Sequence, residues 1–94
     1  MLEKAIERYF CEAVARNGGV AEKVVSLSAR GYFDRVALLP GGRVIFAEIK
    51  KPKGGVVAAH QRTRHAVYRA LGAEVVIKKT FADVDRLMNG SVQN

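Results

Sequence analysis

Three stretches of the sequence decide how this chain folds: Gly31-Tyr32-Phe33-Asp34-Arg35, Leu39-Pro40-Gly41-Gly42 and Phe46-Ala47-Glu48-Ile49-Lys50. Apolar runs separated by proline and glycine are typical of two β-strands joined by a tight turn. The predicted strands are residues 34–39 and 43–50, with the proline and two glycines between them forming a three-residue turn. The rest of the chain is expected to pack around this antiparallel hairpin.

The register of the hairpin brings two acids together. A three-residue turn sets Leu39 opposite Arg43, and the same alignment sets Asp34 opposite Glu48. Lys50 lies on the same face, because alternate side chains of a strand point the same way. Directly opposed like charges destabilise a sheet, and a divalent cation such as Mg²⁺ or Mn²⁺ would offset the repulsion. The structural alternative is that Asp34 caps a turn while the other two lie at a fraying strand end.

Composition points to one small basic domain. The chain has 94 residues, a formal net charge of +7 and a single cysteine. We expect one domain over residues 1–94 and a polyanionic partner such as nucleic acid, the alternative being a basic protein without one. The lone Cys11 fits a reducing cytoplasm. The charged N-terminus is unlike a signal peptide, and no apolar run reaches the roughly 20 residues that span a membrane.

The periodicity of apolar residues predicts seven elements. They are a helix at 2–16, strands at 22–28, 34–39 and 43–50, a helix at 58–71, a strand at 74–79 and a helix at 81–88. The segment from residue 43 to residue 79 predicts a crossover between parallel strands. The expected fold is α/β, with a mixed four-stranded sheet flanked by helices.

The helix at 58–71 divides into two faces. The expected core face consists of small and apolar residues: Ala59, Thr63, Ala66, Val67, Ala70 and Leu71. The opposite side is expected to be an exposed basic surface with Gln61, Arg62, His65 and Arg69. His60 and His65 have no partners at metal-binding spacing, so neither is predicted as a ligand.

Asp34 followed by Glu48-x-Lys50 resembles the signature of the PD-(D/E)xK nucleases. The longer string, Gly31-x-x-Asp34-Arg35, Leu39-Pro40-Gly41-Gly42 and Phe46-x-Glu48-x-Lys50 with a helix near Gln61, resembles the virus-type replication-repair nuclease (VRR-NUC) domain in its stand-alone phage form. The resemblance covers nearly the whole chain. One residue departs from the pattern, because Phe33 stands where the family usually has proline.

The resemblance implies a restriction-endonuclease-like αβββαβ core and a metal-dependent site. Asp34, Glu48 and the backbone carbonyl of Ile49 would hold Mg²⁺ or Mn²⁺. Lys50 would orient the attacking water or neutralise charge on phosphorus, and Gln61 would line the site. A lone helix glutamine is otherwise an ordinary exposed residue.

An acid on the first helix completes the implied site. Glu3 and Glu7 are one turn apart, and without the resemblance each is a solvated helix acid. Glu7-Arg8 is similar to a pair in archaeal junction resolvases, so we choose Glu7, acting directly or through water, and keep Glu3 as the alternative. The expected DNA-binding residues are basic side chains near the site: Lys23, Arg30, Arg35, Lys51, Lys53 and Arg62.

The predicted function is hydrolysis of DNA by a metal-dependent endonuclease. The resemblance implies a homodimer acting on branched DNA, such as a four-way (Holliday) junction, in DNA repair within a phage-infected or bacterial cell. The last helix, with Phe81, Leu87 and Met88, is the expected dimer surface. The alternatives are a non-catalytic basic nucleic-acid-binding module and a small partner-binding protein.

Overall fold

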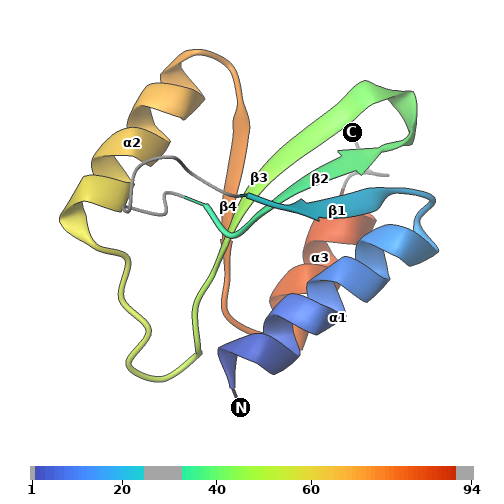
Figure 1. The fold of residues 1–94 in the computed structure, drawn as a ribbon, viewed down its shortest axis with the longest axis horizontal. Helices are drawn as coiled ribbons and strands as arrows, with labels where there is room; N and C mark the ends of the chain where they lie inside the picture. The colour runs from blue at the N-terminus through green and yellow to red at the C-terminus, as the bar shows by residue number, and fades with distance from the viewer. Residues whose placement is uncertain (1, 25–32, 91–94) are drawn as a thin grey trace.

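The computed structural model describes residues 2–24 and 33–90. Its elements follow the predicted order (Figure 1). They are α1 (Glu3–Arg16), β1 (Val20–Lys23), β2 (Arg35–Leu39), the short 3₁₀ turn Pro40–Gly42, β3 (Arg43–Ile49), α2 (Ala59–Ala70), β4 (Glu74–Lys78) and α3 (Phe81–Gly90). None of the helices in these ranges is long and apolar enough to cross a membrane.

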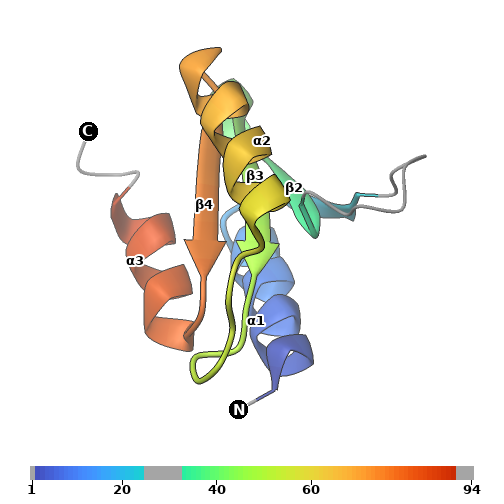
Figure 2. The same cartoon turned by 90° about the vertical axis from the view of Figure 1, so that its left-hand side faces the viewer.

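The four strands form one mixed sheet in the order β1-β2-β3-β4. The β1–β2 and β2–β3 pairs are antiparallel, and β4 joins β3 in parallel through α2. Helices α1 and α3 lie together on one face of the sheet, and α2 lies on the other (Figures 1 and 2). The predicted fold class is therefore confirmed.

The hairpin register is the predicted one. Leu39 pairs with Arg43 and Val36 with Phe46. The turn works because Gly41 and Gly42 both have positive φ, at 83° and 81°, which side chains disfavour. Strand β2 begins one residue later than predicted, but the backbone N–H of Asp34 still donates to the Ala47 carbonyl at 2.9 Å, so the alignment continues to the acid.

The first strand starts earlier than predicted. Residues 22–28 were expected, and the structure has Val20–Lys23, with residues 25–28 outside the described part. The reason is Gly19, which lies so close to β2 that an added Cβ would sit 2.3 Å from the carbonyl oxygen of Leu38. Without a side chain there, the chain enters the sheet directly after α1.

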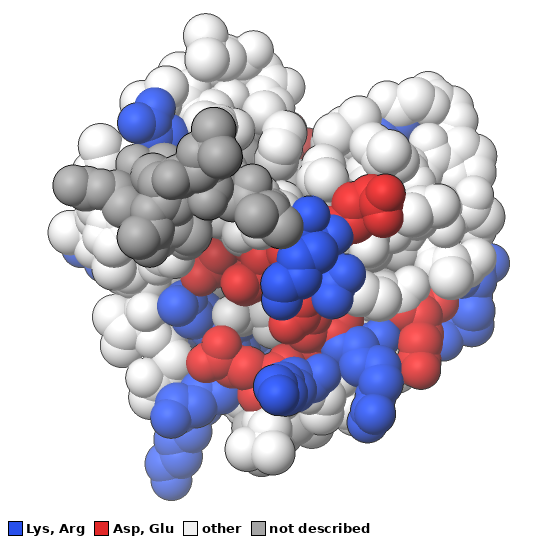
Figure 3. Space-filling view, viewed as in Figure 1, with Lys and Arg blue, Asp and Glu red and all other residues white. Residues whose placement is uncertain are grey.

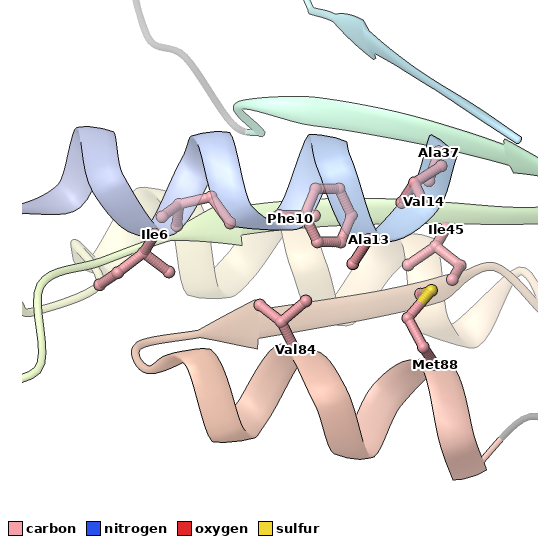
Figure 4. Close-up of a cluster of buried hydrophobic side chains, with 10 residues drawn as sticks. Ile6, Phe10, Ala13, Val14, Ala37, Ile45, Val84 and Met88 are labelled. Carbon is pink, nitrogen blue, oxygen red and sulfur yellow. The ribbon is translucent and has the colours of Figure 1, made fainter. Parts of the chain in front are cut away.

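The main hydrophobic core lies between the sheet and the pair α1 and α3 (Figure 4). Helix α1 contributes a stripe of apolar side chains, with Ile6 and Phe10 completely buried. Helix α3 packs through Val84 and Met88, and the ring of Phe81 stacks on Tyr9 with centroids 4.3 Å apart. An N-terminal cap at Thr80, whose hydroxyl accepts the N–H of Asp83 at 3.0 Å, starts this last helix.

Helix α2 packs with the face opposite to the predicted one. Gln61 and His65, expected in an exposed basic surface, are 7% and 1% exposed, whereas Arg62 and Arg69 are exposed. The six residues predicted as its core face are all exposed: Ala59, Thr63, Ala66, Val67, Ala70 and Leu71. The prediction was wrong because the buried side chains of this helix find polar and aromatic partners on the sheet.

Phe33 is one of those partners. Its ring stacks on His65 with centroids 4.8 Å apart, and it also contacts Phe46 at 5.2 Å and Tyr68 at 5.0 Å. The residue that departs from the family pattern is thus a buried contact between the strand entry and α2. It fixes the backbone just before Asp34 by packing, where a proline would restrict φ.

Candidate active site

Two carboxylates and an amine meet at the end of the β2–β3 hairpin. Asp34 lies just before β2, and its Oδ2 accepts the backbone N–H of Ile49 at 2.7 Å. Glu48 is 2% exposed, and its Oε2 lies 3.1 Å from Nζ of Lys50. Strand alternation separates these groups from Ile49, whose side chain is buried in the main core. The hairpin therefore brings together the three charged residues that the sequence predicts.

Gln61 is held in one orientation by two hydrogen bonds. Its Nε2 donates to Oε2 of Glu48 at 3.0 Å, and its Oε1 accepts the backbone N–H of Ala58 at 3.1 Å. The second bond satisfies one of the free N–H groups at the start of α2. The same side chain thus caps the helix and holds Glu48, so the start of α2 is tied directly to the acid.

Burial and repulsion from nearby carboxylates raise the pKa of both carboxyl groups above their ordinary values. Burial raises the pKa of Glu48 to about 7, and the nearby charge of Asp34 adds to the increase, against the opposing effects of Lys50 and Gln61. The pKa of Asp34 is also raised, chiefly by burial and further by Glu7, although the N–H of Ile49 opposes the shift. Such shifts are typical of functional clefts and follow here from identified neighbours.

The donor set fits a hard divalent cation. Oε1 of Glu48 is buried and has no hydrogen-bond partner within the described residues. Two crowded carboxylates with an open oxygen are what a cation would stabilise, and Mg²⁺ needs only one or two protein carboxylates because it keeps several waters. Within residues 2–24 and 33–90, no group of three or more His, Cys, Asp or Glu side chains forms a larger cluster.

Glu7 approaches the site but is engaged elsewhere. Its Oε2 accepts a hydrogen bond from Nε of Arg35 at 2.7 Å and lies 3.9 Å from Nζ of Lys23. Glu3, the alternative acid, is exposed. The resemblance implies that Glu7 reaches the site, but it gives no sign of a partner 28 residues away.

The other basic residues surround the site unevenly. Lys51 and Lys53 are exposed in the segment after β3, and Nη1 of Arg62 donates to the Val57 carbonyl at 2.7 Å. Arg30 lies outside the described residues. Figure 3 shows acidic and basic side chains gathered over α1 and the middle of the molecule, whereas the end that carries the hairpin turn is largely uncharged.

Comparison with known proteins connects this geometry to a family. The chain is 40% identical over 75 residues to "Putative nuclease p44" of Acyrthosiphon pisum secondary endosymbiont phage 1, covering 80% of each protein. A solved structure described as a VRR_NUC domain superposes with a TM-score of 0.87 at 30% identity, covering 93% of this chain and 94% of that one. No protein-family profile matches the sequence. The extent of both similarities shows that this chain belongs to the VRR-NUC family of nucleases.

Proposed function

We propose that the domain is a Mg²⁺- or Mn²⁺-dependent endonuclease that hydrolyses phosphodiester bonds in DNA and prefers branched DNA. The observation that carries the proposal is the environment of Glu48, whose buried carboxylate lies beside Asp34 and Lys50 and has one oxygen without a hydrogen-bond partner among the described residues. A basic fold that only binds DNA has no need to bury one acid beside another. We expect it to act in the cytoplasm of a phage-infected or bacterial cell.

Asp34, Glu48 and the carbonyl of Ile49 would hold the metal. The hydrogen bond from the Ile49 N–H to Asp34 links two of these donors and limits their relative movement. When bound, the cation supplies Lewis-acid polarisation of a phosphate oxygen and a lowered pKa for its water. Glu7 is the candidate for a further contact through water, once Arg35 releases it.

Lys50 is assigned to the charge that develops on the scissile phosphate. Its ammonium is anchored 3.1 Å from Glu48, and its side chain is only 20% exposed, so it is oriented before substrate binds. Preorganised charge of this kind stabilises a transition state more than a mobile surface lysine does. Gln61 acts as a positioning residue, since it fixes Oε2 of Glu48 and leaves the other oxygen for the metal.

The function is tested with closed circular DNA, which only an endonuclease can nick. We expect nicking with Mg²⁺ or Mn²⁺ and none with EDTA, and the variant Asp34→Asn serves as the matched inactive control. Cleavage that persists in EDTA would contradict the metal assignment. DNA binding without cleavage under any metal would favour the non-catalytic nucleic-acid-binding module, and absence of binding at low salt would favour a partner-binding protein.

We further propose that the domain acts as a homodimer, because it leaves an apolar surface uncovered. Val20, Leu38 and Val44 are successive partners across three strands and are 54%, 47% and 40% exposed. Val44 lies on the same face as Phe46, which Tyr68 of α2 contacts at 5.4 Å. The exposed Val67 is the neighbour of Tyr68 in α2, and the exposed Leu71 directly follows the helix. We call these five exposed residues the apolar row.

The shape of this surface suits a second copy of the chain. A flat sheet row beside a protruding helix is self-complementary under a two-fold axis, because each helix can cover the sheet row of the other protomer. Figure 3 shows the corresponding hollow between α2 and the hairpin. Helix α3, the surface expected from the sequence, is a weaker candidate because Met88 is 6% exposed, and Phe81 and Leu87 pack on the protomer's own core.

The dimer is tested by light scattering at micromolar concentration. We expect a dimer mass for the wild type and a monomer mass for Leu38→Glu, because an unpaired charge cannot be buried in an apolar interface. Val56→Glu is the control, since Val56 is equally apolar, is exposed and lies outside the apolar row. A monomeric wild type, or equal cleavage of linear duplex and four-way junction, would contradict this part of the proposal.

A further inference from the structure

A second charged site lies beside the acidic pair, in a pocket between α1 and the β1–β2 strands. The pocket, which we call the α1 pocket, has a volume of about 460 Å³. Four cationic side chains line it: Lys4, Arg8, Lys23 and Arg35. Lys4 and Arg8 were not among the residues that the sequence predicts to bind DNA, because exposed charges on a helix are usually only solvated.

The α1 pocket carries an excess of positive charge. Among the described residues that line it, Glu7 is the only carboxylate, so four cations face one anion. Arg35 alone makes a short ion pair with that carboxylate, at 2.7 Å, and Lys23 remains 3.9 Å away. Lys4 and Arg8 face the same cavity with no carboxylate of the pocket left for them. An anion in the pocket would therefore meet uncompensated cations on several sides.

Arg35 is oriented before any ligand arrives. Its Nε donates to Glu7, and its Nη1 donates to the backbone carbonyl of Ala21 at 3.3 Å. Two of the three guanidinium nitrogens thus fix the side chain against α1 and β1, and its side chain is 24% exposed. A fixed guanidinium loses less conformational entropy on binding an anion than a mobile one, and its planar fork suits phosphate.

The remaining wall of the pocket is neutral. Cys11 and Ala21 complete the lining, and burial raises the pKa of the Cys11 thiol, which keeps it protonated near neutral pH. A cavity with a cationic rim and a small neutral wall matches a sugar-phosphate unit better than a bare metal or an acidic side chain. It also has room for more than a single phosphate group.

The α1 pocket adjoins the proposed catalytic site. Arg35 directly follows Asp34 in the chain, and the charge of Glu7 in the pocket contributes to the raised pKa of Asp34. Successive residues of a strand point to opposite faces, but Asp34 and Arg35 lie at the same end of the sheet. A DNA strand that passes around this end can therefore meet both places. Figure 3 shows the charged side chains of this region gathered on one face of the molecule.

We propose that the α1 pocket binds a backbone phosphate of the DNA strand, one that flanks the scissile phosphodiester. The inference rests on the proposed nuclease function and adds to it a second contact that holds the strand in position. Binding there would not require the metal, because the four cations that line the pocket are not among the groups proposed to hold it. The pocket can therefore be probed in EDTA, where no cleavage takes place.

The first test compares two double variants that remove the same charge. The pocket variant carries Lys4→Gln and Arg8→Gln, both at exposed helix positions where glutamine is a good helix former. The control carries Arg16→Gln and Arg86→Gln, which lie outside the pocket lining. Fluorescence anisotropy with a labelled four-way junction and with a labelled 12-nucleotide single strand, in EDTA, gives the affinities of all three proteins.

We expect the pocket variant to lose affinity by about tenfold, the effect of one charge-assisted phosphate contact. For the four-way junction, the plot of the log of the association constant against the log of the salt concentration should also become shallower by about 0.9. This is the contribution of one duplex phosphate that is no longer neutralised. The control should change affinity far less. Equal losses in the two variants would overturn the proposal, because only the total charge would then matter.

The second test uses Cys11, the single cysteine of the sequence, as a reporter inside the pocket. Saturating DNA in EDTA should slow labelling of Cys11 by a maleimide in the wild type, and should do so less in the pocket variant at the same DNA concentration. Unchanged labelling of the DNA-bound wild type would overturn the α1 pocket assignment. Metal-dependent nicking by the same wild-type protein would leave the nuclease function intact in that case.

Discussion

Glu48→Gln is expected to abolish cleavage and, without metal, to stabilise the fold. Cleavage should be lost because Oε1 of Glu48, which has no hydrogen-bond partner among the described residues, is proposed to hold the cation. Metal activation is worth several kcal/mol of transition-state stabilisation, which corresponds to about a thousandfold or more in rate. The loss should appear in cleavage of circular DNA, while DNA binding in EDTA persists.

The second effect depends on pH in a definite direction. The pKa of Glu48 is raised from 4.5 to about 7 in the folded protein. Below pH 4.5 the acid is protonated in both the folded and the unfolded states, so it does not lower the free energy of unfolding. Between pH 4.5 and 7 the unfolded state loses its proton first, and the free energy of unfolding falls as pH rises. Above pH 7 Glu48 is ionised in both states, and the free energy of unfolding has fallen by its full amount.

Glutamine cannot ionise, so the variant avoids this penalty. At pH 8 we expect Glu48→Gln to raise the free energy of unfolding by up to about 3 kcal/mol, and near pH 4.5 to change it little. Urea denaturation in EDTA at the two pH values measures the difference. Glu12→Gln, at an exposed position of α1, is the control. The same stabilisation at both pH values would show that the gain does not come from ionisation of Glu48.

Lys50→Met should lower turnover far more than it lowers affinity. The ammonium of Lys50 lies beside Glu48 and is proposed to act on charge that appears only in the transition state. Removing one such group typically lowers kcat by about 10² to 10³, with DNA affinity nearly unchanged. Single-turnover cleavage gives the rate, and anisotropy in EDTA gives the affinity.

Lys51→Met provides the contrast. Lys51 is the next residue but is exposed, and it is expected to contact the DNA backbone only. Its loss should raise KM and leave kcat unchanged, the pattern of an interaction made equally in ground and transition states. If Lys50→Met showed that same pattern, Lys50 would be a phosphate anchor and not a group that assists the chemistry.

The hairpin could be predicted from the sequence because its rules are local. A turn of fixed length sets the register, and the alternation of a strand then decides which side chains share a face. For this reason the pairing of Val36 with Phe46 and the meeting of Glu48 with Lys50 followed directly from the residue numbers. The parallel β3–β4 pair also followed, because a strand, a helix and a strand in succession favour it.

The orientation of α2 could not be predicted in the same way. Periodicity shows that a helix has two faces, but the choice between them assumes that apolar residues are buried. Here the buried stripe carries Gln61, bonded to Glu48 and to the helix start, and His65, stacked on Phe33. Hydrogen bonding removes the usual penalty for burying an amide, so the apolar face is left for another surface.

The position of Glu7 shows a second limit of sequence reasoning. The resemblance implies that Glu7 lies near the site, but its ion pair with Arg35 joins residues on different elements. Likewise, the early start of β1 depends on how closely Gly19 approaches Leu38, which becomes visible only in three dimensions. The roles proposed for Asp34, Glu48 and Lys50 remain predictions that the variants above will decide. The roles proposed for Gln61 and Glu7 also remain predictions.

The mixed sheet also has a consequence for the order of folding. The antiparallel half closes through a three-residue turn, whereas β4 joins β3 only after α2 and its flanking segments are ordered. Closing a long loop slows folding, because the chain loses conformational entropy before the contacts that the loop allows are formed. During synthesis from the N-terminus, both strands of the hairpin are made before β4, and the contact of Gln61 with Glu48 needs a segment made after the hairpin.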